Sequence, residues 1–194
     1  TIRDAVPPQP RHVAFLLAGD RERAGWWGDG RAADVADVVE LARTLGEALG
    51  VTVDVAADAV APFHPGRCAR VALTDGTLVG HVGELHPKAV AALGLPARTV
   101  GGELDLDVLT VASEGTVQAD TLRSFPMAQS DVAVVIDEAV PSSDVARALR
   151  SGAGEHLEAL TLFDVYRGDQ VGEGRKSLAY RLTFRAPDRT LTTD

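Results

Sequence analysis

The chain has 194 residues, of which 45% are hydrophobic and 24% charged, and this composition excludes a disordered chain and a fibrous repeat. The 19 basic residues against 28 acidic ones give a net charge of -9, so bulk positive charge cannot hold nucleic acid, although a local basic surface can. The single Cys68 excludes a disulfide within the chain and a multi-cysteine zinc site. The sequence has no apolar run of membrane-spanning length and no signal-peptide pattern, so we expect a cytoplasmic protein without a membrane partner.

Both ends of the sequence indicate a piece of a longer protein. The first residue is Thr1 rather than Met, and residues 191–194 carry Thr and Asp side chains of the kind that cap a helix N-terminus, with no helix after them. At about 100 to 200 residues per domain, the length allows one large domain or two small ones.

Hydrophobic periodicity predicts an α/β unit with much antiparallel pairing over residues 1–111. Asp75-Gly76 joins two apolar runs and is typical of a β-hairpin turn, while Gly50 and Gly94 are placed to end helices. The predicted strands are 12–18, 51–56, 69–73, 77–83 and 100–106, and the predicted helices are 31–49 and 87–93.

A second domain is predicted over residues 119–194, after a linker at 112–118 where the periodic pattern is lost. Its predicted elements are a strand at 131–137, a helix from Pro141 to near Gly152, and strands at 157–166 and 176–185. The order β-α-β-β is most of a ferredoxin-like split βαβ unit, so the expected fold class of the chain is α+β.

The last two predicted strands separate apolar from polar residues, because neighbouring side chains of a strand point to opposite faces. In the last strand the face expected to pack against the helix holds Leu178, Tyr180, Leu182 and Phe184, and the other face holds Ser177, Ala179, Arg181, Thr183 and Arg185. In the strand before it, the same alternation predicts Phe163 and Val165 inward and Asp164 and Tyr166 outward.

An open sheet face with a ring, a carboxylate and guanidinium groups suits unpaired bases, because rings stack, Asp accepts from base N–H groups and Arg binds phosphate. Residues 175–189 also hold five basic residues against one acidic residue, a net charge of +4. Arg181 and Arg185 are therefore candidates for RNA binding. The pattern alone fits equally well with arginines that keep an exposed strand soluble.

Several sequence blocks occur in one order along the chain. They are 63–67 (Phe-His-Pro-Gly-Arg), 80–87 (Gly-His-Val-Gly-Glu-Leu-His-Pro), 162–168 (Leu-Phe-Asp-Val-Tyr-Arg-Gly), 174–179 (Gly-Arg-Lys-Ser-Leu-Ala) and 190–192 (Thr-Leu-Thr). The last three closely resemble the ferredoxin-fold anticodon-binding domain of the bacterial phenylalanyl-tRNA synthetase beta-subunit family. The first two are similar to the synthetase-like core of the same family, a partial class II synthetase-like antiparallel fold without catalytic motifs.

The resemblance implies a region that is non-catalytic by itself and has two roles in a phenylalanine-tRNA ligase. Residues 1–111 would help to assemble an α2β2 heterotetramer with the alpha subunit and the remainder of the beta subunit. Residues 119–194 would bind the anticodon region of phenylalanine tRNA. Catalysis, with ATP and magnesium, would lie outside this chain, and we expect no cofactor within it.

The resemblance also implies residue roles. Carried over by motif, Asp164 and Tyr166 are the best candidates for anticodon contact, and Arg167, Lys176 and Ser177 are further candidates by proximity. Two departures from the family pattern stand out. Ser130-Asp131 replaces the usual Arg-Asp at the head of the first strand of this domain, and the chain ends before the family's final helix and strand.

Two other functions compete with this interpretation. A free-standing enzyme could use His64, His81, Glu84 and His86 for metal or acid-base chemistry, although a strand places His81 opposite Glu84 and His86, and no His-Glu-x-x-His helix pattern is present. A purely structural interaction domain that never contacts RNA is the third possibility. Trp26-Trp27 fits either core packing or a subunit contact.

Overall fold

In a computed structural model of the protein, residues 7, 9–113 and 124–191 are described. The chain forms two compact units, Thr1–Gln118 and Ala119–Asp194, called unit 1 and unit 2 below. Most of the predicted linker falls on residues 114–118, which lie outside the described residues, as do residues 192–194. Among the described helices, none is both long enough and apolar enough to cross a membrane.

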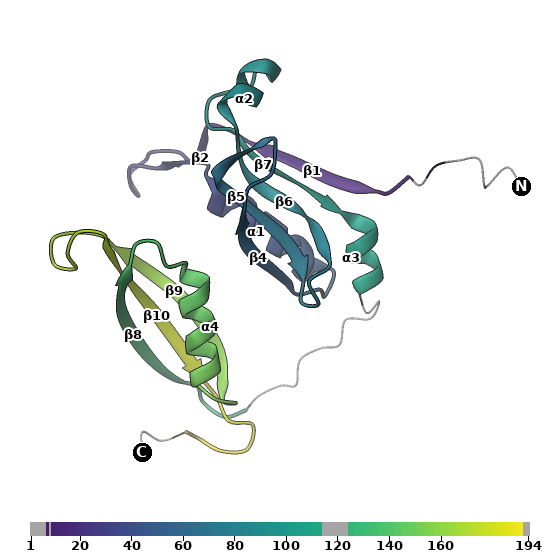
Figure 1. The fold of residues 1–194 in the computed structure, drawn as a ribbon. Coiled ribbons are helices and arrows are strands. Elements are labelled where there is room, and N and C mark those ends of the chain that lie inside the picture. The colour runs from purple at the N-terminus through teal and green to yellow at the C-terminus, as the bar shows by residue number, and fades with distance from the viewer. Residues whose placement is uncertain (1–6, 8, 114–123, 192–194) are drawn as a thin grey trace, which may run out of the picture. The chain divides into compact units, whose positions relative to one another are not determined.

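Unit 1 is an antiparallel five-stranded sheet with a long helix on one face (Figure 1). The strand order is β1-β7-β6-β5-β4, with β1 (His12–Leu17), β4 (Val53–Asp58), β5 (Phe63–Leu73), β6 (Leu78–Leu85) and β7 (Val100–Asp105). Helix α1 (Val35–Ala48) packs Val38 and Ala42 against Val71, Val82 and Leu104 of the sheet, and all five side chains are buried. The predicted antiparallel α/β unit is confirmed.

Helix α1 begins four residues later than the predicted start at 31. The Asp34 side chain accepts a hydrogen bond from the Ala36 N–H, and the Asp37 side chain accepts one from the Asp34 N–H, which together form a capping box. The residues before this cap form instead a short antiparallel hairpin of β2 (Asp20–Glu22) and β3 (Arg31–Ala32). Apolar spacing alone does not separate the end of a hairpin from the first turn of a helix.

Of the two short helices described in unit 1, one was predicted from its proline and glycine at the ends and the other was not. Helix α2 (Pro87–Leu93) has the predicted bounds, and Gly94 ends it with φ = 66°, a left-handed conformation that glycine adopts readily. Helix α3 (Leu106–Ala112) was not predicted. Its N-cap is Asp105, the last residue of β7, so the helix follows the strand with no loop between them.

In the described residues 124–191, unit 2 forms an antiparallel three-stranded sheet with one helix. The elements follow as β8 (Ala128–Asp137), α4 (Ser142–Gly152), β9 (Leu157–Tyr166) and β10 (Arg175–Phe184), and the strand order is β8-β10-β9. This confirms the predicted order β-α-β-β. Helix α4 lies on one face of the sheet (Figure 1). There it packs Val145, Ala146 and Leu149 against Leu178, Tyr180 and Leu182.

Candidate nucleic-acid interface

The face of the unit 2 sheet opposite α4, called the open face below, is covered by none of the described elements of unit 2. Leu178, Tyr180 and Leu182 of β10 point to the helix and are only 1%, 2% and 6% exposed. The residues between them point the other way, as predicted from the alternation. Antiparallel pairing then defines rows across the open face. They are Val135–Ser177–Tyr166, Ala133–Ala179–Asp164, Asp131–Arg181–Thr161 and Gln129–Thr183–Ala159.

A β-bulge in β9 changes which of its residues reach the open face. The register pairs Asp164 with Ala179 but the next position, Tyr180, with Leu162, so Phe163 is the extra residue. The Phe163 side chain is 51% exposed, and the Arg181 guanidinium lies over its ring, 5.2 Å from the centroid. The prediction that Phe163 points inward is therefore wrong, because strict alternation does not survive an inserted residue.

The outward direction predicted for Asp164 and Tyr166 is confirmed by the register, which places them opposite Ala179 and Ser177. Tyr166 is 41% exposed and Asp164 is exposed. Within the described residues, the Asp164 carboxylate has no hydrogen-bond or ion-pair partner. Both of its oxygens are thus available as acceptors for a ligand.

Arg181 is held by its neighbours on the open face. Its Nε and Nη2 atoms donate to the two carboxylate oxygens of Asp131 at 2.9 and 2.8 Å, and these hydrogen bonds lower the pKa of Asp131. Arg185 likewise donates to Glu158 at 3.0 Å. The two arginines predicted to bind RNA are therefore ion-paired within the protein, and the positive charge of each is matched by a carboxylate.

Arg167 and Lys176 meet at one acidic residue. The Arg167 guanidinium donates from Nε and Nη2 to the Glu138 carboxylate at 3.0 and 2.8 Å, and these bonds lower the pKa of Glu138. Lys176 lies opposite Ile136, in register with the helix-facing residues, and is 8% exposed. Its Nζ donates to the Glu138 carbonyl at 2.8 Å. This burial places the Lys176 ammonium away from the open face. Its proximity to the other candidates in the sequence therefore did not predict its position on the sheet.

Ser177 and Ser130 differ in their position on the sheet. Ser177 lies half-buried on the open face, between Tyr166 and Val135, where the prediction placed it. Ser130, which replaces the family arginine, lies opposite Leu182 in register with the helix-facing residues. The departure from the family pattern therefore does not alter the open face.

Of the residues in the competing enzyme hypothesis, His64 and His86 have stacked rings with centroids 6.3 Å apart, while His81 and Glu84 make separate contacts. His64 Nδ1 accepts from the Gly66 N–H, and His86 Nδ1 accepts from the Lys88 N–H at the start of α2. His81 contacts Asp58 at 3.1 Å, and the buried Glu84 carboxylate lies 2.8 Å from Arg67. In the part of the chain that the structure describes, no three His, Cys, Asp or Glu side chains are placed to hold a metal. The contacts serve turns, a helix cap and a buried ion pair.

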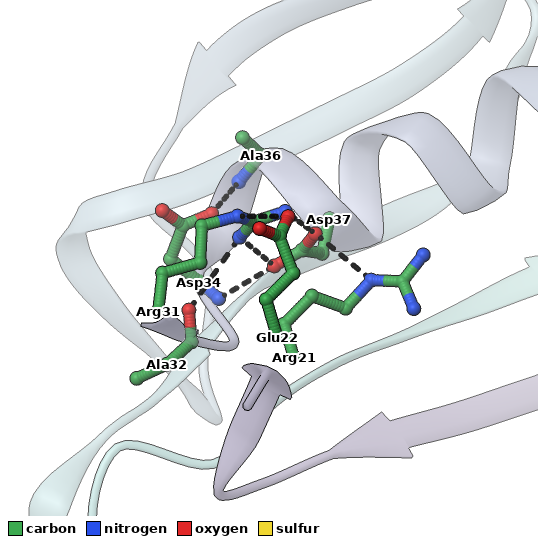
Figure 2. A network of polar contacts seen from close by, with 7 residues as sticks. All are labelled: Arg21, Glu22, Arg31, Ala32, Asp34, Ala36 and Asp37. Carbon is green, nitrogen blue, oxygen red and sulfur yellow. Dashed lines mark hydrogen bonds and ion pairs between the residues drawn. The ribbon is translucent and has the colours of Figure 1, made fainter. Parts of the chain in front are cut away.

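The two tryptophans stand at the tip of the β2–β3 hairpin. Trp26 is 94% exposed and Trp27 64% exposed, so the core-packing interpretation of this pair is wrong. At the base of the hairpin, Arg31 donates to both oxygens of the buried Asp37 at 2.7 and 2.8 Å, and Arg21 contacts the same carboxylate (Figure 2). These hydrogen bonds, chiefly from Arg31, hold the pKa of Asp37 well below its usual range. The hairpin is thereby fixed to the first turn of α1.

The outward position of Phe163 and the Asp131–Arg181 ion pair were not predicted from the sequence. No residue type marks the bulge that turns Phe163 outward. Opposite charges on two strands gave a weak signal for the pair, but only the register between β8 and β10 brings the two residues together.

Comparison with known proteins assigns both units. Residues 2–106 match the family described as the phenylalanyl tRNA synthetase beta chain CLM domain, and residues 124–194 match the ferredoxin-fold anticodon binding domain. The second match confirms the ferredoxin-like fold expected for unit 2.

Curated relatives match over nearly the whole chain. A phenylalanine–tRNA ligase beta subunit from Streptomyces avermitilis is 55% identical over 98% of this chain and 23% of its own length. Proteins of the same name from Thermobifida fusca and Corynebacterium glutamicum are 51% and 49% identical over 100% and 98% of this chain, and over 24% and 22% of their own lengths. The chain thus spans about a quarter of the length of these relatives. It belongs to the phenylalanyl-tRNA synthetase beta chain family, with a CLM domain followed by a ferredoxin-fold anticodon-binding domain.

Proposed function

We propose that the open face of unit 2 binds the anticodon loop of phenylalanine tRNA. The observation that carries this proposal is the exposed carboxylate of Asp164 between two exposed rings, Phe163 and Tyr166, on a face that α4 does not cover. A carboxylate without a protein partner accepts from base N–H groups, and exposed rings stack on unpaired bases. The family of unit 2, an anticodon-binding domain, supports the same ligand.

The small side chains of the central row leave room for a base beside Asp164. Ala133 and Ala179 lie in the same row as this carboxylate, and neither reaches far above the sheet. A base that lies over these alanines can present its edge to Asp164, with Tyr166 at one side and Phe163 at the other. We infer that base contacts supply most of the affinity, because Arg181 and Arg185 are already ion-paired with protein carboxylates.

For unit 1 we propose a role in subunit assembly. The exposed Trp26 and Trp27, on a hairpin that ion pairs hold rigid, are of the kind that protein interfaces bury. The relatives are named as beta subunits, so the proposed partners are the alpha subunit and the remainder of the beta subunit in an α2β2 enzyme. In that enzyme the chain itself is non-catalytic, ATP and magnesium bind elsewhere, and the location is the cytoplasm. These last points rest on the family assignment.

The binding proposal is tested in the assembled ligase with the variant Asp164→Asn and the control Glu173→Gln, which removes one charge from an exposed turn of unit 2. Affinity is measured for phenylalanine tRNA and for the same tRNA with a scrambled anticodon. We expect Asp164→Asn to lose about 1 to 3 kcal/mol of binding to the cognate tRNA, since hydrogen bonds to a charged group are lost. Equal affinities of the two variants for the cognate tRNA would refute the role of Asp164.

A further inference from the structure

The ring of Tyr166 occupies the space where a side chain at position 168 would begin. A β-carbon built on Gly168 would lie 2.8 Å from Cζ of Tyr166 and 3.3 Å from Cε1, and closer still to the hydroxyl oxygen. Real β-carbons essentially never come within 3.0 Å of another heavy atom, so the ring would have to move. Because the ring is the far end of a flexible side chain, it is the group that would yield.

The need for glycine at this position is one of space rather than of backbone conformation. Gly168 does not have a positive φ, unlike Gly172 and Gly174 in the same loop. An alanine at 168 can therefore adopt the same backbone without strain, and its methyl group would change only the room left for Tyr166.

Arg167, between Tyr166 and Gly168, is held by a residue that follows the strand at the opposite edge of the sheet. Arg167 binds the Glu138 carboxylate through Nε and Nη2, and Glu138 directly follows β8. The Glu138 N–H donates to the Gly174 carbonyl at 2.8 Å, and its own carbonyl accepts from Lys176. These bonds fix the start of the β9–β10 loop, so Gly168 stays beneath the ring.

We propose that Gly168 is a positioning residue, which holds the Tyr166 ring in the orientation that meets an RNA base, with the Arg167–Glu138 pair fixing the loop around it. The part of this proposal that concerns RNA rests on the proposed function of the open face. Arg167 thereby acts through the protein rather than on the RNA backbone.

The first test reads the ring directly and does not depend on RNA. The chain contains two tyrosines, so ring-labelled ¹³C-tyrosine gives separate NMR signals for exposed Tyr166 and buried Tyr180 in the 194-residue chain. We expect Gly168→Ala to shift the Tyr166 signal and to leave that of Tyr180. The control is Gly152→Ala, where an added β-carbon meets nothing within 4 Å and the glycine φ is not positive. An unmoved Tyr166 signal in Gly168→Ala would overturn the proposal.

The second test measures cognate tRNA binding by the assembled ligase with Gly168→Ala, Tyr166→Ala and the double variant. Loss of a stacked base corresponds to about a 5- to 150-fold weaker affinity, and we expect each single variant to fall in this range. Because Gly168 acts through Tyr166, the double variant should be no weaker than Tyr166→Ala. If Tyr166→Ala weakens binding while Gly168→Ala matches Gly152→Ala, the positioning role is refuted and the proposed function stands. If Tyr166→Ala binds normally, the proposed function of Tyr166 is refuted. The NMR result then tests only whether Gly168 fixes the orientation of the Tyr166 ring.

Discussion

The contact among Asp131, Arg181 and Phe163 determines how much positive charge the open face presents. The guanidinium of Arg181 is bound by two hydrogen bonds to Asp131 and lies over the Phe163 ring. The sequence predicted a free arginine for phosphate, because the alternation of β10 places Arg181 outward but does not show what faces it. The facing residue depends on the register between strands about 50 positions apart, which no local pattern specifies.

Asp131→Asn should make Arg181 available to phosphate. We expect stronger tRNA binding at low salt and a steeper dependence of the binding constant on salt, by up to about one unit of slope for one added phosphate contact. The matched control is Asp137→Asn, which removes an exposed charge from the same strand without releasing Arg181. An identical salt slope for both variants would mean that Arg181 does not reach phosphate even when its partner is removed.

The bulge in β9 is the feature of a single element that most affects the open face. With one extra residue at 163, Leu160 packs into the core beneath α4 and Leu162 pairs with the helix-facing Tyr180, while Asp164 and Tyr166 remain outward on the other side of the bulge. Without the bulge, regular alternation would turn one of these two sets to the wrong face. The alternation from Asp164 onward was therefore predictable, but the direction of Phe163 was not.

Phe163 and Leu178 should differ sharply in their effect on stability. Phe163→Ala removes a half-exposed ring, and we expect a loss of no more than about 1 kcal/mol in the free energy of unfolding of unit 2. Leu178→Ala removes a side chain that is 1% exposed and should cost about 2 to 5 kcal/mol. Hydrogen exchange of peptides from β8, β9 and β10 in urea reports this unit separately. A loss from Phe163→Ala as large as that from Leu178→Ala would show that the ring is part of the core.

The β2–β3 hairpin depends on the buried carboxylate of Asp37. Because Arg31 lowers the folded-state pKa of Asp37, the ionised carboxylate stabilises the fold at pH values above its unfolded pKa of about 4, and this contribution is lost as the pH falls toward the folded value. We expect Asp37→Asn to cost about 1 to 3 kcal/mol at pH 7, with a gap to the native protein that narrows below about pH 4.

Hydrogen exchange of peptides from α1, β2 and β3 in urea measures this effect in unit 1. Glu40→Gln, an exposed change on the same helix, is the control and should lose little at any pH. A gap between Asp37→Asn and the native protein that stays constant from pH 7 to pH 3 would contradict the ion-pair explanation.

At the scale of the whole molecule, the two units carry two separate candidate surfaces, the Trp26-Trp27 hairpin tip and the open face. The sequence predicted most of the elements in both units, because their apolar periodicity and turn residues are local. It left open whether the two tryptophans are buried or exposed, since the β2–β3 hairpin is too short to show a strand pattern.

The two surfaces should be separable by mutation. We expect the double variant Trp26→Ser and Trp27→Ser to reduce co-purification with the alpha subunit. Val111→Ser, which changes a side chain that is 86% exposed in the same unit, serves as the control and should leave co-purification intact. Normal recovery of the alpha subunit with the tryptophan variant would refute the assembly role of the hairpin.

The contact that we propose between the open face of unit 2 and the anticodon can be measured directly. The most direct measurement is the affinity of the assembled ligase for phenylalanine tRNA and for its scrambled-anticodon counterpart, before and after Phe163, Asp164 and Tyr166 are replaced together by alanine. We expect the triple variant to bind the cognate tRNA at least about tenfold more weakly and no longer to distinguish the two tRNAs. Unchanged affinity with unchanged discrimination would contradict the proposed contact.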